Sequence, residues 1–207
     1  MSGTIRIGIG GPVGSGKTRL IERLVPLLNE IGLRCGVITN DLMTDEDADR
    51  VRRSGVIDPA LVLAVQTGAC PHTAIREDPS ANLAAIQKLE LIRPDLDVIL
   101  VESGGDNLAA TFTSELVDYW IFVIDTAAGD DIPRKRGLGI LQCDVLVVNK
   151  TDLAPFVGAD LDRMRIDLQL ARPAQATLFT DLRSGDGLAE LFNTVRRDAL
   201  FGERNTA

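Results

Sequence analysis

The sequence predicts an α/β fold with a doubly wound, mostly parallel sheet of about seven strands in a Rossmann-like, three-layer arrangement. Short apolar runs alternate along the chain with longer segments whose leucines and isoleucines recur every three or four residues. The strand expected at residues 97–101 is continuously apolar over residues 98–101, which is typical of a strand covered on both faces. With 207 residues, 45% of them hydrophobic, the chain suits one domain over residues 1–207, with a frayed tail at 201–207.

Seven strands and four helices can be placed from these patterns. The expected strands lie at residues 5–9, 34–39, 61–65, 97–101, 119–124, 144–148 and 177–180. The expected helices lie at residues 19–31, from 78–79 to just before 94, at 159–171 and at 187–200, with a further helix starting near residues 106–108. Residues 132–137 are expected to form a basic loop.

A glycine-rich motif separates the first strand from the first helix. It reads G-x-x-x-x-G-K-T and comprises Gly11, Pro12, Val13, Gly14, Ser15, Gly16, Lys17 and Thr18. Its glycines let backbone N–H groups surround a phosphate without interference from a Cβ atom. Lys17 can reach the β- and γ-phosphates, and the Thr18 hydroxyl can bind Mg²⁺. Because strand, loop and helix follow in the right order, a nucleoside triphosphate site is favoured over a chance glycine-rich turn.

Acidic residues follow two of the expected strands. Asp41 ends the second strand and is a candidate for Mg²⁺, directly or through water, because ligands gather at the carboxyl ends of parallel strands. Glu102 ends the fourth strand and can support the Mg²⁺ shell, while the N–H of Gly105 can bond the γ-phosphate. Glu46 or Asp47 either positions the attacking water or belongs to a solvated, charged helix start. No glutamine follows Gly105, so intrinsic hydrolysis is expected to be slow. Lys17, Asp41, Glu46 and Glu102 form the catalytic set.

A second nucleotide motif, N-K-x-D, follows the sixth strand. Asp152 can accept hydrogen bonds from the ring N–H and the exocyclic amine of guanine together, a donor pair that adenine lacks. Lys150 can lie over the base, and Asn149 can connect this segment to the phosphate loop. The motif is weak alone, but it gains weight from its place after a phosphate loop. The sequence therefore predicts GTP as the ligand.

Cys70 and His72 flank a proline in the loop that leaves the third strand. A half-buried cysteine and a hydrogen-bonded histidine are one interpretation. Metal binding is the other, because a thiolate and an imidazole suit Zn²⁺, Cu or Ni²⁺ rather than Mg²⁺. Two ligands do not complete a site, but a two-fold homodimer would supply two sulfurs and two nitrogens, which matches square-planar Ni²⁺ or tetrahedral Zn²⁺.

Composition excludes several other roles. A net charge of −8 argues against binding nucleic acid or an anionic membrane. No apolar run approaches the ~20 residues of a membrane span, so the expected location is cytoplasmic. Three widely spaced cysteines do not resemble a disulfide framework.

Several stretches together resemble one family. They are the phosphate loop, TND from Thr39, EDA from Glu46, TGACPHTAIRED from Thr67, ESGGDNLAATF from Glu102, IPRK from Ile132 and NKTDLAP from Asn149. CPHTAIRED and ESGGDNL in combination are much more specific than either nucleotide motif. The chain resembles the urease accessory GTPases, the UreG family, which share a broad class with the hydrogenase nickel GTPases. The resemblance covers residues 5–191.

The resemblance implies that Cys70 and His72 bind Ni²⁺ across a GTP-bound homodimer. It implies that Ni²⁺ then passes to the urease apoprotein with the help of other urease accessory proteins, and that GTP hydrolysis drives its release. The chain departs from the family at Ala69, where a second glycine is usual. It also departs at residues 113–115, where Ser-Pro-Glu is usual, and at Arg136 and Leu138, which stand in place of Gly and Pro.

The sequence thus predicts a GTP-binding, GTP-hydrolysing nickel metallochaperone for urease, with GTP, Mg²⁺ and Ni²⁺ as ligands. One alternative is a nickel GTPase that serves another metalloenzyme, such as a hydrogenase. Another is a P-loop kinase for a small metabolite, against which the N-K-x-D motif argues. A third is a non-catalytic nickel-binding partner protein.

Overall fold

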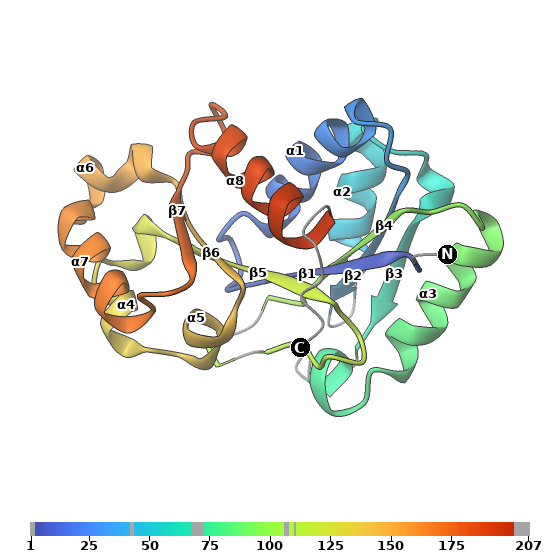
Figure 1. The fold of residues 1–207 in the computed structure, drawn as a ribbon, viewed down its shortest axis with the longest axis horizontal. Helices are drawn as coiled ribbons and strands as arrows, with labels where there is room; N and C mark the ends of the chain where they lie inside the picture. Colours follow the sequence, from blue (N-terminus) through green and yellow to red (C-terminus); the bar gives the residue numbers. More distant parts are fainter. Residues whose placement is uncertain (1–2, 42–43, 68–72, 106–107, 110, 201–207) are drawn as a thin grey trace.

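The computed structural model describes residues 3–41, 44–67, 73–105, 108–109 and 111–200. Within these residues, seven strands form one sheet in the order β3-β2-β4-β1-β5-β6-β7 (Figure 1). Every pair of neighbouring strands is parallel, so the sheet is wholly rather than mostly parallel. The strands are β1 (Ile5–Gly10), β2 (Cys35–Asp41), β3 (Val62–Gln66), β4 (Val98–Glu102), β5 (Tyr119–Asp125), β6 (Val145–Asn149) and β7 (Ala176–Phe179).

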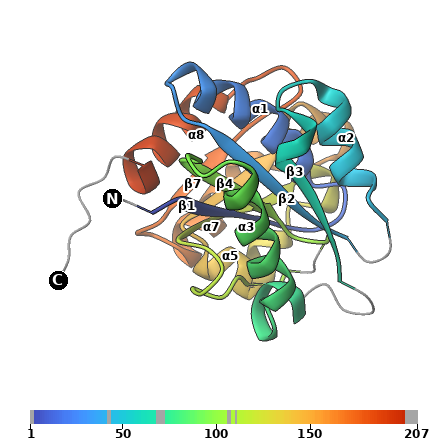
Figure 2. The same ribbon diagram turned by 90° about the vertical axis from the view of Figure 1, so that its right-hand side faces the viewer.

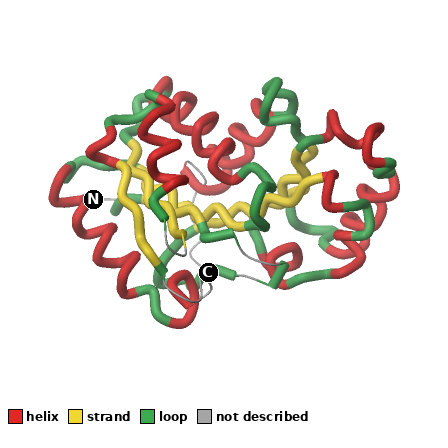
Figure 3. The backbone as a smooth tube through the Cα atoms, turned by 180° about the vertical axis from the view of Figure 1, so that it is seen from behind, coloured by secondary structure: helices red, strands yellow, loops and turns green. Residues whose placement is uncertain are grey.

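Helices cover both faces of the sheet, which gives the expected three layers. In the described residues the α-helices are α1 (Lys17–Glu30), α2 (Glu46–Ser54), α3 (Ser80–Ile92), α4 (Ile132–Lys135), α5 (Leu138–Gln142), α6 (Ala154–Val157), α7 (Leu161–Ala171) and α8 (Leu188–Val195). Helices α1, α2 and α8 lie on one face, and α3, α5 and α7 lie on the other (Figures 1 and 3). The side view in Figure 2 shows α1 and α3 on opposite sides of the strands. Among these residues, no helix is long and apolar enough to cross a membrane.

The side-chain alternation of the central strands explains the two-sided core. In β4, Val98 and Leu100 join the core under α1, α2 and α8, whereas Ile99 and Val101 join the core under α3. Successive strand residues point to opposite faces, so a strand covered on both sides must be apolar at every position. The continuous apolar run in the sequence has this physical origin.

The carboxyl ends of the strands gather the polar residues. β1 lies between β4 and β5, and the phosphate loop follows it directly. Strands β2, β4 and β6 end at Asp41, Glu102 and Asn149. Because all strands run in one direction, these residues meet at one edge of the sheet, where open α/β sheets bind ligands.

Two local expectations were wrong. Residues 108–109 form a turn and residues 111–118 contain no helix, so no helix starts from 108; residues 106–107 lie outside the described residues. The basic segment 132–137 begins with the short helix α4 instead of being only a loop. Leu91 of α3 and Leu170 of α7 are 83% and 70% exposed, because each lies on a helix face turned away from the sheet.

Candidate functional site

The phosphate loop is built as the motif predicts. Gly11, Gly14 and Gly16 have positive φ angles, which side chains disfavour. A Cβ at Gly11 would lie 2.1 Å from the carbonyl oxygen of Val123, so only glycine fits there. Lys17 is 6% exposed, and its Nζ donates to the Pro12 carbonyl oxygen at 3.2 Å, which keeps the ammonium group against the loop. The loop therefore presents backbone N–H groups and one held cation.

Acidic side chains gather on one side of this loop. The Thr18 hydroxyl donates to Glu102 Oε1 at 2.8 Å and lies 3.1 Å from Asp47 Oδ1. Asp47 thus touches the loop, whereas Glu46 lies exposed one position earlier on α2. Of the two carboxylates that the sequence left open, the fold brings Asp47 to Thr18 and leaves Glu46 at the pocket wall.

Glu102 is electrostatically unusual. Its side chain is 1% exposed, and burial raises its pKa to about 7, with a smaller rise from Asp47, while Lys17, Thr18 and Arg50 act in the opposite direction. Its Oε2 has no hydrogen-bond partner among the described residues. A buried, unpartnered carboxyl oxygen beside a hydroxyl is the oxygen donor set that Mg²⁺ prefers, so these residues fit that cation.

Asp41 and Gly105 border the same space. Asp41 is half-buried at the end of β2, and its carboxylate accepts a hydrogen bond from the Thr44 hydroxyl. Gly105 has a φ of +78°, and a Cβ there would lie 2.5 Å from Cγ2 of Val13, the exposed residue at the tip of the phosphate loop. The segment after β4 therefore approaches the loop closely because residue 105 has no side chain.

Asn149 connects the second motif to the first, as expected. Its Nδ2 donates to the carbonyl oxygen of Ser15 at 2.8 Å, and its Oδ1 accepts from the N–H of Leu182 at 3.1 Å. The Thr180 hydroxyl adds a bond of 3.3 Å to the same oxygen. Asn149 is 3% exposed, so its bonds are shielded from water. This one side chain joins three segments that are distant in sequence.

Lys150 and Asp152 lie beyond Asn149 at the pocket mouth. Lys150 adopts a left-handed conformation with a φ of +59°, and its Nζ lies 3.6 Å from Asp125 Oδ1. Asp152 is exposed and lines the pocket. Asp181, which also lines the pocket, accepts from the N–H groups of Arg183 and Ser184, and these bonds hold the turn at residues 181–184 in place. The structure thus places the N-K-x-D residues where a nucleobase could lie.

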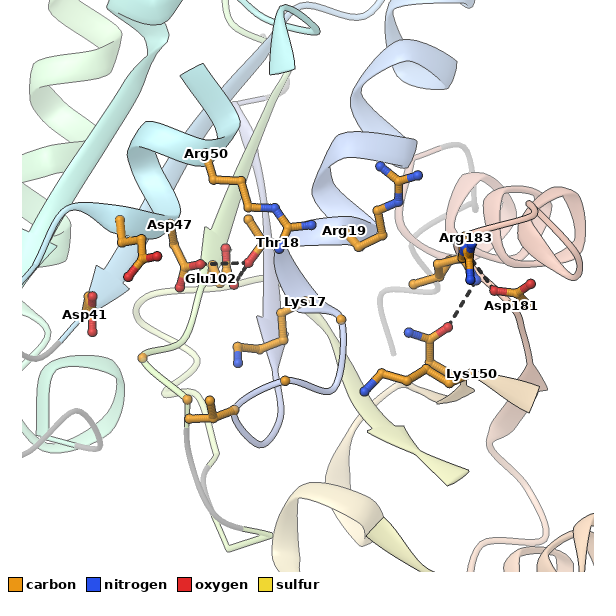
Figure 4. Close-up of a pocket in the computed structure, with 18 of the residues that line it drawn as sticks. Lys17, Thr18, Arg19, Asp41, Asp47, Arg50, Glu102, Lys150, Asp181 and Arg183 are labelled. Atoms are coloured by element: carbon orange, nitrogen blue, oxygen red, sulfur yellow. Dashed lines mark hydrogen bonds between the residues drawn. The ribbon is translucent and has the colours of Figure 1, made fainter. Parts of the chain in front are cut away.

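These groups line one pocket of about 610 Å³. In Figure 4, Asp41, Asp47 and Glu102 lie on one side of Lys17 and Thr18, and Lys150, Asp181 and Arg183 lie on the other. Arg50 also lines the pocket, although it belongs to none of the sequence motifs. The available signal was its spacing: three residues after Asp47, it lies on the same face of α2.

Cys70 and His72 lie outside the described residues, so the metal prediction stays a prediction. In the described part of the chain, no three His, Cys, Asp or Glu side chains come together as a cluster able to hold a metal ion. Cys35 and Cys143 are buried thiols. Burial raises the pKa of Cys143 to about 11, which keeps it protonated and unsuited to metal binding.

A wholly parallel sheet with this loop after its first strand, and a buried acid after a neighbouring strand, defines the P-loop class of nucleotide-binding proteins. The family model described as "CobW/HypB/UreG, nucleotide-binding domain" matches residues 5–179, and the chain belongs to this family.

Individual relatives agree with that assignment. The urease accessory protein UreG of Mycolicibacterium gilvum (strain PYR-GCK) is 73% identical over 198 residues, which is 96% of this chain and 96% of that protein. The hydrogenase maturation factor HypB from Archaeoglobus fulgidus is 29% identical, with a TM-score of 0.73 over 93% of this chain and 89% of that chain. HypB from Helicobacter pylori, solved in complex with nickel, has a TM-score of 0.78 and covers 93% and 86%; at 20% identity this likeness shows the fold alone.

Proposed function

We propose that this protein is a Mg²⁺-dependent GTPase that binds Ni²⁺ in a GTP-dependent homodimer and delivers it to urease during assembly of the urease active site. One observation carries the nucleotide part of the proposal: the phosphate loop, the Thr18–Glu102 pair and the N-K-x-D residues line a single pocket. The likeness to UreG over nearly the whole chain carries the metal part.

The phosphate end has the groups that phosphoryl transfer needs. Lys17 and the loop N–H groups would hold the β- and γ-phosphates, and Gly105 would contact the γ-phosphate. Thr18, Asp41 and Glu102 would hold Mg²⁺, which neutralises charge that develops on the phosphate oxygens. Asp47 lies close enough to Thr18 to orient a water molecule, a role for which Glu46 is the further candidate. With no glutamine after Gly105 to place that water, hydrolysis is slow.

The base end supports guanine over adenine. Asp152 would accept from the ring N–H and the amine of guanine, and Lys150 would lie over the ring. Adenine would leave the carboxylate without these donors. A competition experiment tests the choice: GTP should displace a fluorescent guanine nucleotide, and ATP should not. Preferential binding of ATP would contradict the proposal and favour a kinase.

The Ni²⁺ cargo would bind at Cys70 and His72 from each of two subunits. The γ-phosphate would hold the segments after β2 and β4 in one arrangement, which favours the dimer, and hydrolysis or partner binding would release it. Size-exclusion chromatography with metal analysis, with and without GTP and Ni²⁺, is the direct test. Nickel-linked dimers should appear only when both are present.

The metal ligands are tested by Cys70→Ala and His72→Ala. Both variants should lose GTP-dependent, nickel-linked dimerisation and keep nearly normal GTP binding. If either variant still dimerises with full nickel stoichiometry, the shared-site model is wrong. Single-turnover hydrolysis in the same samples separates a GTPase from a non-catalytic nickel-binding partner.

The likeness to the hydrogenase maturation factor HypB from Archaeoglobus fulgidus favours one second candidate, a nickel GTPase that serves a different metalloenzyme such as a hydrogenase. Expression of this chain in cells that lack their own urease accessory GTPase distinguishes the two. Restored urease activity supports delivery to urease, with other accessory proteins as partners. Failure to restore it, together with restored hydrogenase activity in a matching strain, supports the second candidate.

A further inference from the structure

A second groove lies beside the nucleotide pocket, between α1, α2 and the start of α8. It has a volume of about 640 Å³. Its charged lining residues are four arginines and one acid: Arg19, Arg23, Arg50, Arg53 and Glu22. The whole chain carries a net charge of −8, so this groove has the opposite sign to the rest of the protein. A local excess of positive charge on an acidic protein attracts anionic partners to that place.

The Glu22 carboxylate is hydrogen-bonded to two of these arginines. Glu22 accepts from Arg19 Nη1 at 2.9 Å and from Arg50 Nε at 2.8 Å, with Arg50 Nη2 at 3.3 Å. Burial raises the pKa of Glu22, but hydrogen bonds and charge from Arg50 and Arg19 outweigh it, so the pKa lies below its ordinary value. The acid is therefore ionised, and it still supplies only one negative charge to two guanidinium groups.

The other two arginines add donors that the protein does not neutralise. Arg23 donates to the carbonyl oxygens of Leu182 and Arg183 at 3.0 Å and 2.5 Å, so neutral groups hold it in place. Arg53 is exposed at the end of α2, and its side chain has no hydrogen bond or ion pair among the described residues. Guanidinium groups bind carboxylates in a bidentate geometry, which makes a carboxylate a fitting occupant.

The rest of the groove is apolar. Pro26, Leu27, Val56 and Leu188 line it and are half-buried. Pro26 also has no N–H, so the Glu22 carbonyl four residues earlier lacks its helical partner and can accept from an incoming peptide. Arginines beside an apolar wall suit a peptide with acidic and apolar side chains better than they suit a bare inorganic anion.

We propose that this groove is the docking site for an acidic, partly apolar segment of a partner protein. This proposal rests on the proposed function in one respect: it takes partner proteins to receive the Ni²⁺ that this chain delivers. Arg19 and Arg50 line both the groove and the nucleotide pocket. Two polar contacts join α1 to α2, Glu22–Arg50 and Thr18–Asp47. A partner carboxylate that binds Arg50 therefore acts on the helix that carries Asp47, so partner binding and nucleotide binding are coupled in both directions.

The test uses a fluorescein-labelled peptide of alternating Glu and Leu, and the same peptide with Gln in place of Glu. The wild-type protein should bind the acidic peptide saturably, and the Gln peptide at least tenfold more weakly. Arg53→Glu should weaken acidic-peptide binding at least tenfold. Arg163→Glu makes the same charge change away from the groove and should leave binding intact; Arg163 is exposed on α7, and its side chain has no partner in the described part of the chain.

The proposal is overturned if no saturable binding is seen up to about 1 mM peptide, if both variants lose binding equally, or if both peptides bind equally well. Displacement of the peptide by inorganic phosphate or by a single-stranded oligonucleotide at equal concentration also overturns it, because the groove would then be a general anion site. GTP binding by the Arg53→Glu variant is measured in parallel and should be unchanged. If the wild-type protein does not bind GTP, the proposed function is refuted instead. Peptide binding can still be measured in that case, so the two failures are distinguishable.

Discussion

The two ends of the nucleotide pocket are prepared in opposite ways. At the base end, Asn149 already bonds Ser15 and Leu182, and Asp181 bonds two backbone N–H groups. At the phosphate end, Glu102 is fully buried with one carboxyl oxygen unpartnered among the described residues, and the Ser15 hydroxyl is also unpartnered there. One end is satisfied by the protein itself, and the other leaves polar groups for a ligand.

The difference indicates how binding energy is divided. Groups that are already hydrogen-bonded within the protein hold a recognition surface in place. Such a surface gives specificity because little conformational entropy is lost when the ligand binds. Buried, unpaired groups lower stability until a ligand satisfies them, so the ligand binds more tightly there and can stabilise one arrangement of the surrounding segments. We therefore expect substitutions at the phosphate end to change turnover, and substitutions at the base end to change selectivity or stability.

The largest expected effect follows Lys17→Ala at the phosphate end. Removing the held cation should lower single-turnover GTP hydrolysis on the order of 10²–10³-fold, because a charged donor aimed at the reacting phosphate is lost. Rates are measured under saturating GTP and Mg²⁺. Lys88→Ala, an exposed lysine of α3, is the matched control and should hydrolyse GTP normally. A near-normal rate for Lys17→Ala would show that Lys17 at the phosphate end does not contribute to hydrolysis.

Glu102→Gln tests the unsatisfied acid in protein free of metal and nucleotide. Because burial raises the pKa of Glu102 from 4.5 to about 7, the unfolded chain releases this proton first as pH rises. As the pH rises from the first pKa to the second, the free energy of unfolding falls by about 3 kcal/mol. The loss is complete above pH 7. Glu102→Gln should remove this pH dependence, as measured by urea unfolding from pH 4.5 to 8. Glu90→Gln, on an exposed site of α3, should retain it; identical curves for the two variants would contradict the account.

Asp152→Asn tests selectivity at the base end. GTP affinity should fall by about 2–3 kcal/mol because the guanine donors lose a charged acceptor. Xanthosine triphosphate, which presents an oxygen where guanine has its amine, should gain affinity because the new amide can donate to it. Competition with a fluorescent nucleotide measures both changes, with Asp162→Asn, an exposed residue of α7, as the control. Unchanged preference for GTP would show that Asp152 does not contact the base.

The smallest effect is expected for a substitution of Asn149, the residue that connects the two ends of the nucleotide pocket. Asn149→Ala should lower the free energy of unfolding by about 1–2 kcal/mol, because the buried Leu182 N–H and Ser15 carbonyl lose their partner. For a chain of this size the midpoint of thermal unfolding should drop by roughly 2–8 °C. Asn193→Ala, on the exposed face of α8, should not lower it. Equal midpoints would mean that the two ends are not joined through Asn149.

Local motifs predicted most of this pocket. Strand, glycine-rich loop and helix are consecutive in the sequence, so the positions of Lys17 and Thr18 follow from local geometry alone. Glu102 and Asn149 were also predictable, because each ends a buried strand and parallel strands end at one edge. The roles proposed for all these residues still await the experiments above.

Contacts across separate elements were less predictable. The sequence could not choose between Glu46 and Asp47, because the choice depends on how α2 is rotated against α1, and Arg50 escaped notice for the same reason. Arg136 shows a further limit. It occupies a left-handed conformation with a φ of +49°, and the surrounding structure must offset a cost of about 1 kcal/mol.

By itself, the sequence determined the class of protein, the seven strands and the longer helices, and the residue types at both ends of the pocket, because those depend on periodicity and on short motifs. Tertiary structure alone decided which carboxylate meets Thr18, how Asn149 joins the two motifs, and that four arginines converge between α1, α2 and α8. The physical reason is distance along the chain. Residues brought together from separate elements leave no local pattern, and only packing against the sheet sets their mutual orientation.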